Sequence, residues 1–154
     1  MGNVFKFNLD SEGIGHLAFD LPNEKVNKFT LAVLEELEKT IDDLAKNPDI
    51  KALLITSGKP DVFIAGADLK SFIPMFKDPS LVEPMIRAGH RTFNKLQNLP
   101  FPTIALINGA CLGGGMEMAL ACTYRIVTDN PKTQLGLPET SLGIIPGWGG
   151  TQRM

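Results

Sequence analysis

Three consecutive glycines, Gly113 to Gly115, place a bare stretch of backbone just before an apolar segment that contains a single carboxylate, Glu117. Residues 103–109, which precede the glycines, have the length and composition of a buried strand, and residues 114–122 suit a helix. Peptide N–H groups at the start of a helix have no partner within it, and the helix dipole places about half a positive charge there. The sequence therefore predicts a strand that leads through the glycines into a helix start able to bind an oxygen carrying negative charge.

The rest of the chain alternates between strand and helix patterns. Strand, helix and strand in turn imply right-handed crossovers and a largely parallel sheet, so the fold class is α/β. Thr30 is predicted to cap a helix whose buried stripe consists of Leu31, Leu34, Leu37, Ile41 and Leu44. The predicted elements are a hairpin of residues 3–9 and 13–21, a helix after Thr30 that closes at 47–49, a strand at 51–58, a loop at 57–70, a helix from Leu81 to Leu99, a strand at 103–109, a helix from Gly114 to Cys122, and a strand at 124–129.

Composition excludes several classes of protein. A chain of 154 residues with 44% hydrophobic and 21% charged residues predicts one compact, soluble domain. A formal net charge of -2 without runs of like charge argues against nucleic-acid binding. Cys111 and Cys122 lack a CxxC spacing and a histidine partner, so we expect reduced core thiols and no metal site.

No signal peptide or membrane span is recognisable. Because the chain stops at the opening turn of a helix, we expect it to be part of a longer domain.

The glycine triplet allows two interpretations. Its sequence matches neither GxGxxG nor GxxxxGK[ST], which argues against a phosphate loop. Glycine could simply permit close packing of strand and helix, or it could open a site for a carbonyl oxygen that becomes an oxyanion. For the second interpretation, another glycine-bearing turn, residues 63–70, follows the preceding buried strand, and the N–H groups of Ala67 and Gly114 would converge at one edge of the sheet.

Two carboxylates accompany this predicted oxyanion site. Glu117 lies three residues beyond Gly114, on the same face of the predicted helix, and Glu139 follows Pro138. Apolar neighbours favour a buried Glu117 with a raised pKa over a solvated acid at a helix start. Taken alone, Glu139 is better explained as a salt-bridged loop residue. Two carboxylates beside a polarised carbonyl compound can move two protons around one water molecule.

Other conspicuous residues have simpler explanations. Asp68 is expected to cap the turn that follows it. The apolar cluster formed by Phe72, Ile73, Met75 and Phe76 is expected to pack in the core, with an acyl-chain wall as the functional alternative. Trp148 is either a pocket wall or part of an interface. His16, in a strand, and His90, on a solvated helix face, have no nucleophile in a recognisable setting, which argues against a hydrolase triad.

The segments "FIAGADLK", "INGACLGGGMEMALAC" and "LGLPETSLGIIPGWGGTQR" resemble the crotonase (enoyl-CoA hydratase/isomerase) superfamily. The resemblance covers almost the whole chain and is greatest to the hydratase region of the α subunits of fatty acid oxidation complexes. It implies the N-terminal part of a ββα superhelix, without the C-terminal helical region, so that residues 1–154 form a crotonase-like domain that is incomplete at its C-terminus.

The resemblance also implies an activity and roles for residues. The N–H groups of Ala67 and Gly114 would hold the thioester oxygen of an acyl-CoA, Glu117 and Glu139 would be the two catalytic glutamates of hydratases, and Gly147 would help to hold the water. The reaction implied is syn hydration of a trans-2-enoyl-CoA to a 3-hydroxyacyl-CoA. A Δ3,Δ2-enoyl-CoA isomerase and a non-catalytic acyl-CoA-binding fragment are the alternatives. The residues expected to contact CoA are Lys25, Val26, Ala65, Asp68 and Leu69.

Further expectations follow from the same resemblance. Coenzyme A enters as part of the substrate, so no cofactor is expected. The full-length protein is expected to form a homo-oligomer or to join a fatty acid oxidation complex. The location implied is the cytoplasm, or the mitochondrial matrix if the source is eukaryotic.

Overall fold

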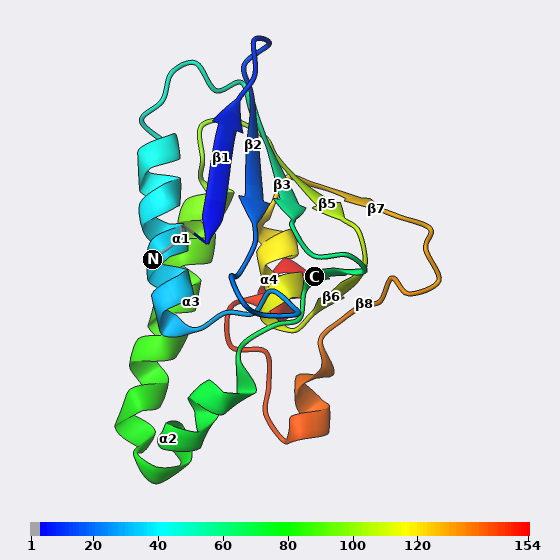
Figure 1. Ribbon diagram of the computed structural model, residues 1–154. Coiled ribbons are helices and arrows are strands. Elements are labelled where there is room, and N and C mark those ends of the chain that lie inside the picture. The colour runs from blue at the N-terminus through cyan, green and yellow to red at the C-terminus, as the bar shows by residue number, and fades with distance from the viewer. Residues whose placement is uncertain (1–3) are drawn as a thin grey trace.

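The structure is a computed structural model that describes residues 4–154. Its main sheet has the strand order β1-β2-β3-β5-β7 (Figure 1). β1 and β2 are antiparallel, and each later strand runs parallel to its neighbour, which confirms both the hairpin and the largely parallel sheet. Residue 3 of the predicted hairpin lies outside the described residues. The strands of this sheet are β1 (Phe5–Leu9), β2 (Ile14–Phe19), β3 (Ala52–Ser57), β5 (Thr103–Ile107) and β7 (Tyr124–Val127).

A second, three-stranded parallel sheet has the order β4-β6-β8 and was not predicted. Residues 57–70, predicted to be a loop, contain its first strand. The chain turns from one sheet to the other at Gly109, where a Cβ would overlap the main chain of Asp61, so only glycine permits this approach. The glycine-bearing turns therefore follow strands of the small sheet, and not those of the main sheet as predicted. The strands are β4 (Val62–Ile64), β6 (Ala110–Leu112) and β8 (Leu135–Gly136).

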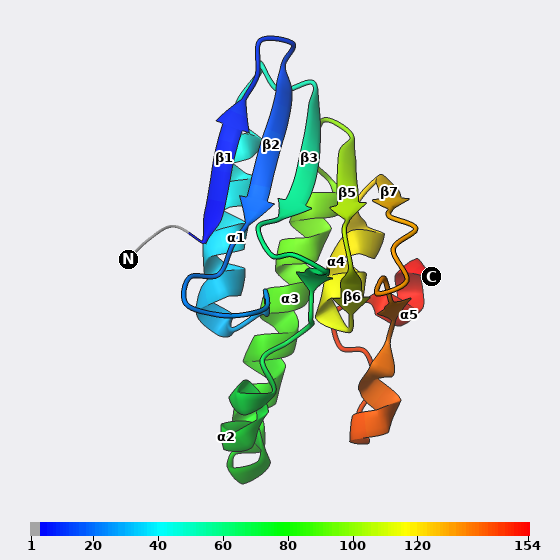
Figure 2. The ribbon, with the colours of Figure 1, turned by 45° about the vertical axis from the view of Figure 1, so that its right-hand side comes forward.

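Two long helices lie side by side on one face of the main sheet (Figures 1 and 2). α1 (Leu31–Leu44) begins as predicted, with the Thr30 hydroxyl accepting from the Val33 N–H. α3 (Val82–Gln97) matches the second predicted helix. Leu31 was wrongly placed on the buried stripe, because it lies in the first turn of α1 and is 44% exposed. The remaining helices are α2 (Phe72–Lys77), α4 (Gly114–Ala121), α5 (Gly150–Arg153) and the 3₁₀ turns Leu69–Ser71, Pro79–Leu81 and Pro138–Leu142.

The core lies between the main sheet and these helices. Cys111 and Cys122 are buried there as free thiols, as predicted, and burial raises the pKa of each to about 12. By contrast, the predicted core position of the cluster at residues 72–76 is wrong for Ile73 and Phe76, which are 58% and 81% exposed, whereas Met75 packs against the core. The reason is that α2 lies beyond the end of both sheets, beside the start of α3 (Figure 2). No helix within residues 4–154 has the length and apolar character needed to cross a bilayer.

Replacing Glu38 by glutamine is expected to remove a contribution to the free energy of unfolding that is lost at acid pH. Glu38, on α1, accepts hydrogen bonds from Arg91 and Lys95, on α3, and these partners, Arg91 foremost, lower its pKa to about 2. The unfolded chain binds this proton near the ordinary value of 4.5, so the stabilisation is complete above that pH and is lost as the pH falls toward 2. We expect Glu38→Gln to cost about 1–2 kcal/mol at pH 7.

Urea unfolding from pH 7 to pH 2 measures this contribution. The difference between wild type and Glu38→Gln should shrink toward acid pH, and Glu35→Gln, at an exposed position on the same helix, is the matched control. A difference that stays constant over the whole pH range would contradict the assignment.

Candidate active site

The turns that follow β4 and β6 lie against each other. A Cβ built on Gly66 would lie 3.0 Å from the Leu112 carbonyl oxygen and 3.6 Å from the Gly114 nitrogen. Gly66 has φ +103°, a conformation that side chains rarely adopt. Glycine at this position therefore lets the turn that carries Ala67 approach the first turn of α4.

The N–H of Ala67 is directed by a short parallel bridge. Phe29 donates its N–H to the Gly66 carbonyl and accepts from the Asp68 N–H, each at 2.8 Å. Because successive residues of an extended chain direct their N–H groups to opposite sides, the Ala67 N–H points away from Phe29. Within residues 4–154, the N–H groups of Ala67 and Gly114 donate to no acceptor. Two free donors thus stand at adjacent turns.

The glycine triplet is also needed for packing. A Cβ on Gly114 would overlap the indole ring of Trp148, and one on Gly115 would overlap the Ile64 main chain. Gly113 has φ +52°, which favours glycine. The interpretation as close packing is therefore confirmed, and it is compatible with the other one, because close packing brings the start of α4 to the Ala67 turn.

Trp148 lies in the interior and is only 5% exposed. Its ring meets those of Phe29 and Phe93 edge to face, with centroids 5.9 and 5.8 Å apart. Trp148 thus belongs to the core of the described residues, and its role as a pocket wall or interface residue stays a prediction. The packing partners come from the segment before α1 and from α3, which the sequence around Trp148 does not reveal.

Glu117 is a buried carboxylate held by backbone N–H groups. It is 2% exposed, and its Oε1 accepts from Trp148 N at 2.7 Å and Gly150 N at 2.9 Å. Burial raises its pKa, the two N–H donors partly counteract that rise, and the negative charge of Glu139 adds to it. The predicted burial and raised pKa are confirmed. Both N–H donors bind Oε1, which leaves Oε2 for other contacts.

Glu139 lies on the 3₁₀ turn Pro138–Leu142 and is 8% exposed. A Cβ on Gly113 would lie 3.1 Å from its Oε1, so its carboxylate lies beside the start of α4. The alternative of a salt-bridged loop residue is wrong, because Glu139 pairs with no cation in the described part of the chain. Its Oε2 is buried without a hydrogen-bond partner there, which is unfavourable unless another molecule supplies one.

The other predicted site residues lie around these turns. Gly147 is half-buried and directly precedes Trp148, whose N–H donates to Glu117. Asp68 accepts from Lys70 N at 3.4 Å, which confirms the predicted cap, and lies 3.6 Å from the Lys28 ammonium. Among the predicted CoA contacts, Lys25, Ala65 and Leu69 are exposed, and Val26 and Asp68 are half-buried.

Of two further residues near the site, one was predicted from the sequence and one was not. Gly66 is the glycine of the predicted turn 63–70, and its positive φ confirms that this turn favours glycine. Asn27, a buried loop residue with four side-chain hydrogen bonds, gave no signal in the sequence.

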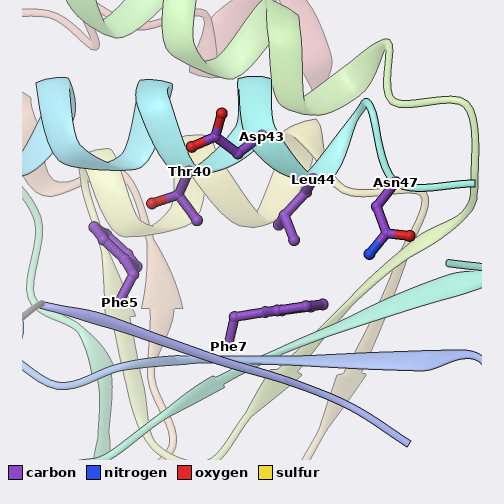
Figure 3. A pocket seen from close by; sticks show the side chains of 6 residues that line it. All are labelled: Phe5, Phe7, Thr40, Asp43, Leu44 and Asn47. Atoms are coloured by element: carbon purple, nitrogen blue, oxygen red, sulfur yellow. The ribbon is translucent and has the colours of Figure 1, made fainter. Parts of the chain in front are cut away.

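A hollow of about 440 Å³ between β1 and α1 lies apart from this site (Figure 3). None of the predicted site residues lines it. Its lining residues are Phe5, Phe7, Thr40, Asp43, Leu44 and Asn47.

The site as a whole combines two free N–H donors with two buried carboxylates. Such donors stabilise a carbonyl oxygen that gains negative charge, and a buried carboxylate with a raised pKa, as in Glu117, can transfer a proton. The fold and site therefore define a mixed α/β protein equipped to polarise a carbonyl compound and to move protons beside it.

Comparison with known proteins identifies the family and supports the mixed α/β fold. The model of the enoyl-CoA hydratase/isomerase family matches residues 10–154. The fatty acid oxidation complex subunit alpha of Aliivibrio fischeri is 45% identical over 153 residues, which are 99% of this chain and 22% of that protein. The protein of the same name from Vibrio campbellii is 44% identical over 151 residues, 98% of this chain and 21% of its own.

Solved structures show the same fold. An enoyl-CoA hydratase from Bacillus anthracis superimposes with a TM-score of 0.88 at 34% identity, over 97% of this chain and 56% of that one. A chain from Geobacillus kaustophilus HTA426 gives a TM-score of 0.90 at 34% identity, over 99% and 56% of the two chains. The protein belongs to the enoyl-CoA hydratase/isomerase family and has the crotonase fold. It spans about a fifth of the length of the curated relatives it matches and just over half of the length of the solved chains.

Proposed function

We propose that the protein is an enoyl-CoA hydratase, which adds water syn across the double bond of a trans-2-enoyl-CoA to give the 3-hydroxyacyl-CoA. The observation that carries the proposal is the pair of free N–H groups, at Ala67 and Gly114, beside two buried carboxylates. Members of the family that shift a double bond need to move only one proton back and forth. Two carboxylates suit the addition of water, in which one proton is taken up and another is delivered.

In the proposed mechanism, the N–H groups of Ala67 and Gly114 hold the thioester oxygen. As water attacks C3, the negative charge moves through the conjugated system onto that oxygen. Each donor is expected to stabilise this charge by about 3–4 kcal/mol in the transition state. Because the donors are fixed by the backbone, no reorganisation is needed when the charge develops.

Glu117 is the proposed general base. Its Oε1 is fixed by two N–H groups, and its free Oε2 takes a proton from the water as the oxygen bonds to C3. Glu139 is proposed to deliver the proton to C2, and its partnerless Oε2 suits contact with the reacting water or substrate. The Gly147 N–H is proposed to help hold that water.

Coenzyme A is proposed to bind across the neighbouring loops, as the resemblance implies. Lys25 and Val26 precede α1, and Ala65, Asp68 and Leu69 belong to the Ala67 turn. The hydrogen bond from Ala65 N to the Asn27 carbonyl oxygen, at 2.8 Å, joins the two loops. No cofactor or metal takes part in the proposed reaction.

We propose that residues 1–154 are the N-terminal part of a crotonase-like domain. A homo-oligomer or a fatty acid oxidation complex is the proposed assembly of the full-length protein. Its proposed location is the cytoplasm, or the mitochondrial matrix in a eukaryote.

The test uses the full-length protein and a trans-2-enoyl-CoA in water enriched in ¹⁸O. We expect loss of the conjugated absorbance and a 3-hydroxyacyl-CoA that carries the label. Double-bond migration without label in a hydroxyl would instead establish the isomerase alternative. Binding of the thioester without any product would establish the non-catalytic alternative.

Replacing Glu139 by glutamine is expected to lower kcat for hydration by about 10²-fold or more, because the proton for C2 is lost. KM should change little, since the N–H groups that hold the thioester are untouched. Steady-state kinetics on the folded variant measures both constants. Glu12→Gln, at an exposed carboxylate in the β1–β2 turn, is the control. Unchanged turnover in Glu139→Gln would remove Glu139 from the mechanism.

A further inference from the structure

Asn27 is a fully buried polar residue in the loop between β2 and α1. We propose that it is a positioning residue that fixes both the direction of the Ala67 N–H and the loop 22–26. The inference rests on the proposed function, because it assigns the residue to the same thioester site. It concerns a side chain that touches neither the carboxylates nor the two donor N–H groups.

The Asn27 side chain joins residues of three strands. Its Nδ2 donates to the Phe19 carbonyl at 2.8 Å, to the Ser57 hydroxyl at 2.9 Å and to the Phe63 carbonyl at 3.3 Å. These partners belong to β2, β3 and β4, so a single amide connects the main sheet to the small sheet. The NH₂ group of an amide supplies donors for these oxygens, which a carboxylate of the same shape does not.

The same side chain closes the loop before it. Asn27 Oδ1 accepts from Leu21 N at 2.9 Å, which brings the two ends of the loop 22–26 together. Lys59 supports this closure, since its Nζ donates to the Leu21 carbonyl at 2.8 Å. The loop carries Lys25 and Val26, which are the proposed CoA contacts.

Backbone hydrogen bonds connect Asn27 to the turn that carries Ala67. The Asn27 carbonyl accepts from Ala65 N at 2.8 Å, and two residues later Phe29 bonds to both neighbours of Ala67. Three backbone hydrogen bonds thus hold residues 65–68 against residues 27–29. Because this ladder determines where the Ala67 N–H points, displacement of Asn27 would turn a donor away from the thioester oxygen.

An aspartate at this position keeps the shape of the side chain and loses its donors. The Asn27→Asp carboxylate would face the two carbonyl oxygens and the hydroxyl without a hydrogen to share. We expect kcat to fall about tenfold to a hundredfold, as small displacements of catalytic groups do. KM should rise as well, because the loop 22–26 loses its anchor.

A chromophoric probe separates positioning from mere stability. An arylacryloyl-CoA with a para-dialkylamino donor absorbs further to the red when its carbonyl oxygen is polarised. The wild-type full-length protein should shift this band on binding, and the Asn27→Asp protein should bind the probe with a smaller shift. Leu37→Ala, a destabilised core variant in α1, is the matched control and should keep the full shift and full kcat in its folded fraction.

The outcomes distinguish the inference from the proposed function. A wild-type protein that binds the probe without any red shift lacks a polarising site, which overturns the proposed function and the inference together. A full shift and full kcat in folded Asn27→Asp overturns the inference alone. If Asn27→Asp does not fold, Ser57→Ala removes one acceptor of Asn27 and should reduce the shift and kcat in the same sense. Unchanged values in Ser57→Ala would then overturn the inference.

Discussion

Glu117→Gln should lower kcat for hydration by about 10²–10⁴-fold and leave the fold intact, because the variant loses its general base and keeps its anchor. The glutamine oxygen can accept from Trp148 N and Gly150 N, as Oε1 of the glutamate does. The NH₂ group then stands where the free Oε2 was, and it cannot accept a proton. Stopped-flow or steady-state loss of the enoyl absorbance measures the effect.

Glu36 offers a matched control for this substitution. Its Oε1 also accepts two backbone N–H groups, from Val4 at 2.6 Å and Phe5 at 3.3 Å, but it lies on α1, away from the site. Glu36→Gln should therefore retain kcat. In the wild type, burial raises the pKa of Glu117. Because a general base acts only when it is unprotonated, kcat should begin to fall, as the pH is lowered, at a higher pH than for an ordinary glutamate. Wild-type turnover in Glu117→Gln would exclude Glu117 as the base.

Gly114→Ala is expected to lower both the free energy of unfolding and kcat. The added methyl group would overlap the Trp148 ring, which is itself packed between Phe29 and Phe93. Overpacking of this kind costs about 1–3 kcal/mol, and any shift of α4 that relieves it moves the Gly114 N–H. Both the free energy of unfolding and kcat should therefore fall. Urea unfolding and hydration kinetics on the same preparation measure them.

Gly136→Ala is the control for this prediction. No atom lies within 4 Å of a Cβ at Gly136, so the free energy of unfolding should stay within about 0.5 kcal/mol of wild type. Equal stability and equal kcat in the two variants would contradict the close packing described for Gly114.

The long elements could be predicted because their patterns repeat over many residues. The stripe of α1 and the cap at Thr30 are local, so the sequence between residues 30 and 44 contains them. The small sheet could not be predicted in this way. β4 and β6 have three residues each, and their pairing shifts in register between Val62 and Ile64, so no alternation develops.

The candidate site was predictable where backbone conformation dictates the residue. Gly113 and its neighbours mark the start of α4, and Glu117 follows at a fixed helical spacing. Contacts between segments that are distant in the sequence have no such local pattern. Trp148 is buried against Phe29 and Phe93. Asn27 forms hydrogen bonds with residues of three strands. Both sets of contacts join segments that only folding brings together.

A crystal structure of the full-length protein with a bound acyl-CoA tests the central claim most directly. The thioester oxygen should lie about 2.7–3.1 Å from the nitrogens of both Ala67 and Gly114. Its reacting carbons should face the carboxylates of Glu117 and Glu139. A thioester oxygen bound elsewhere, or one held by only one of the two nitrogens, would contradict the account.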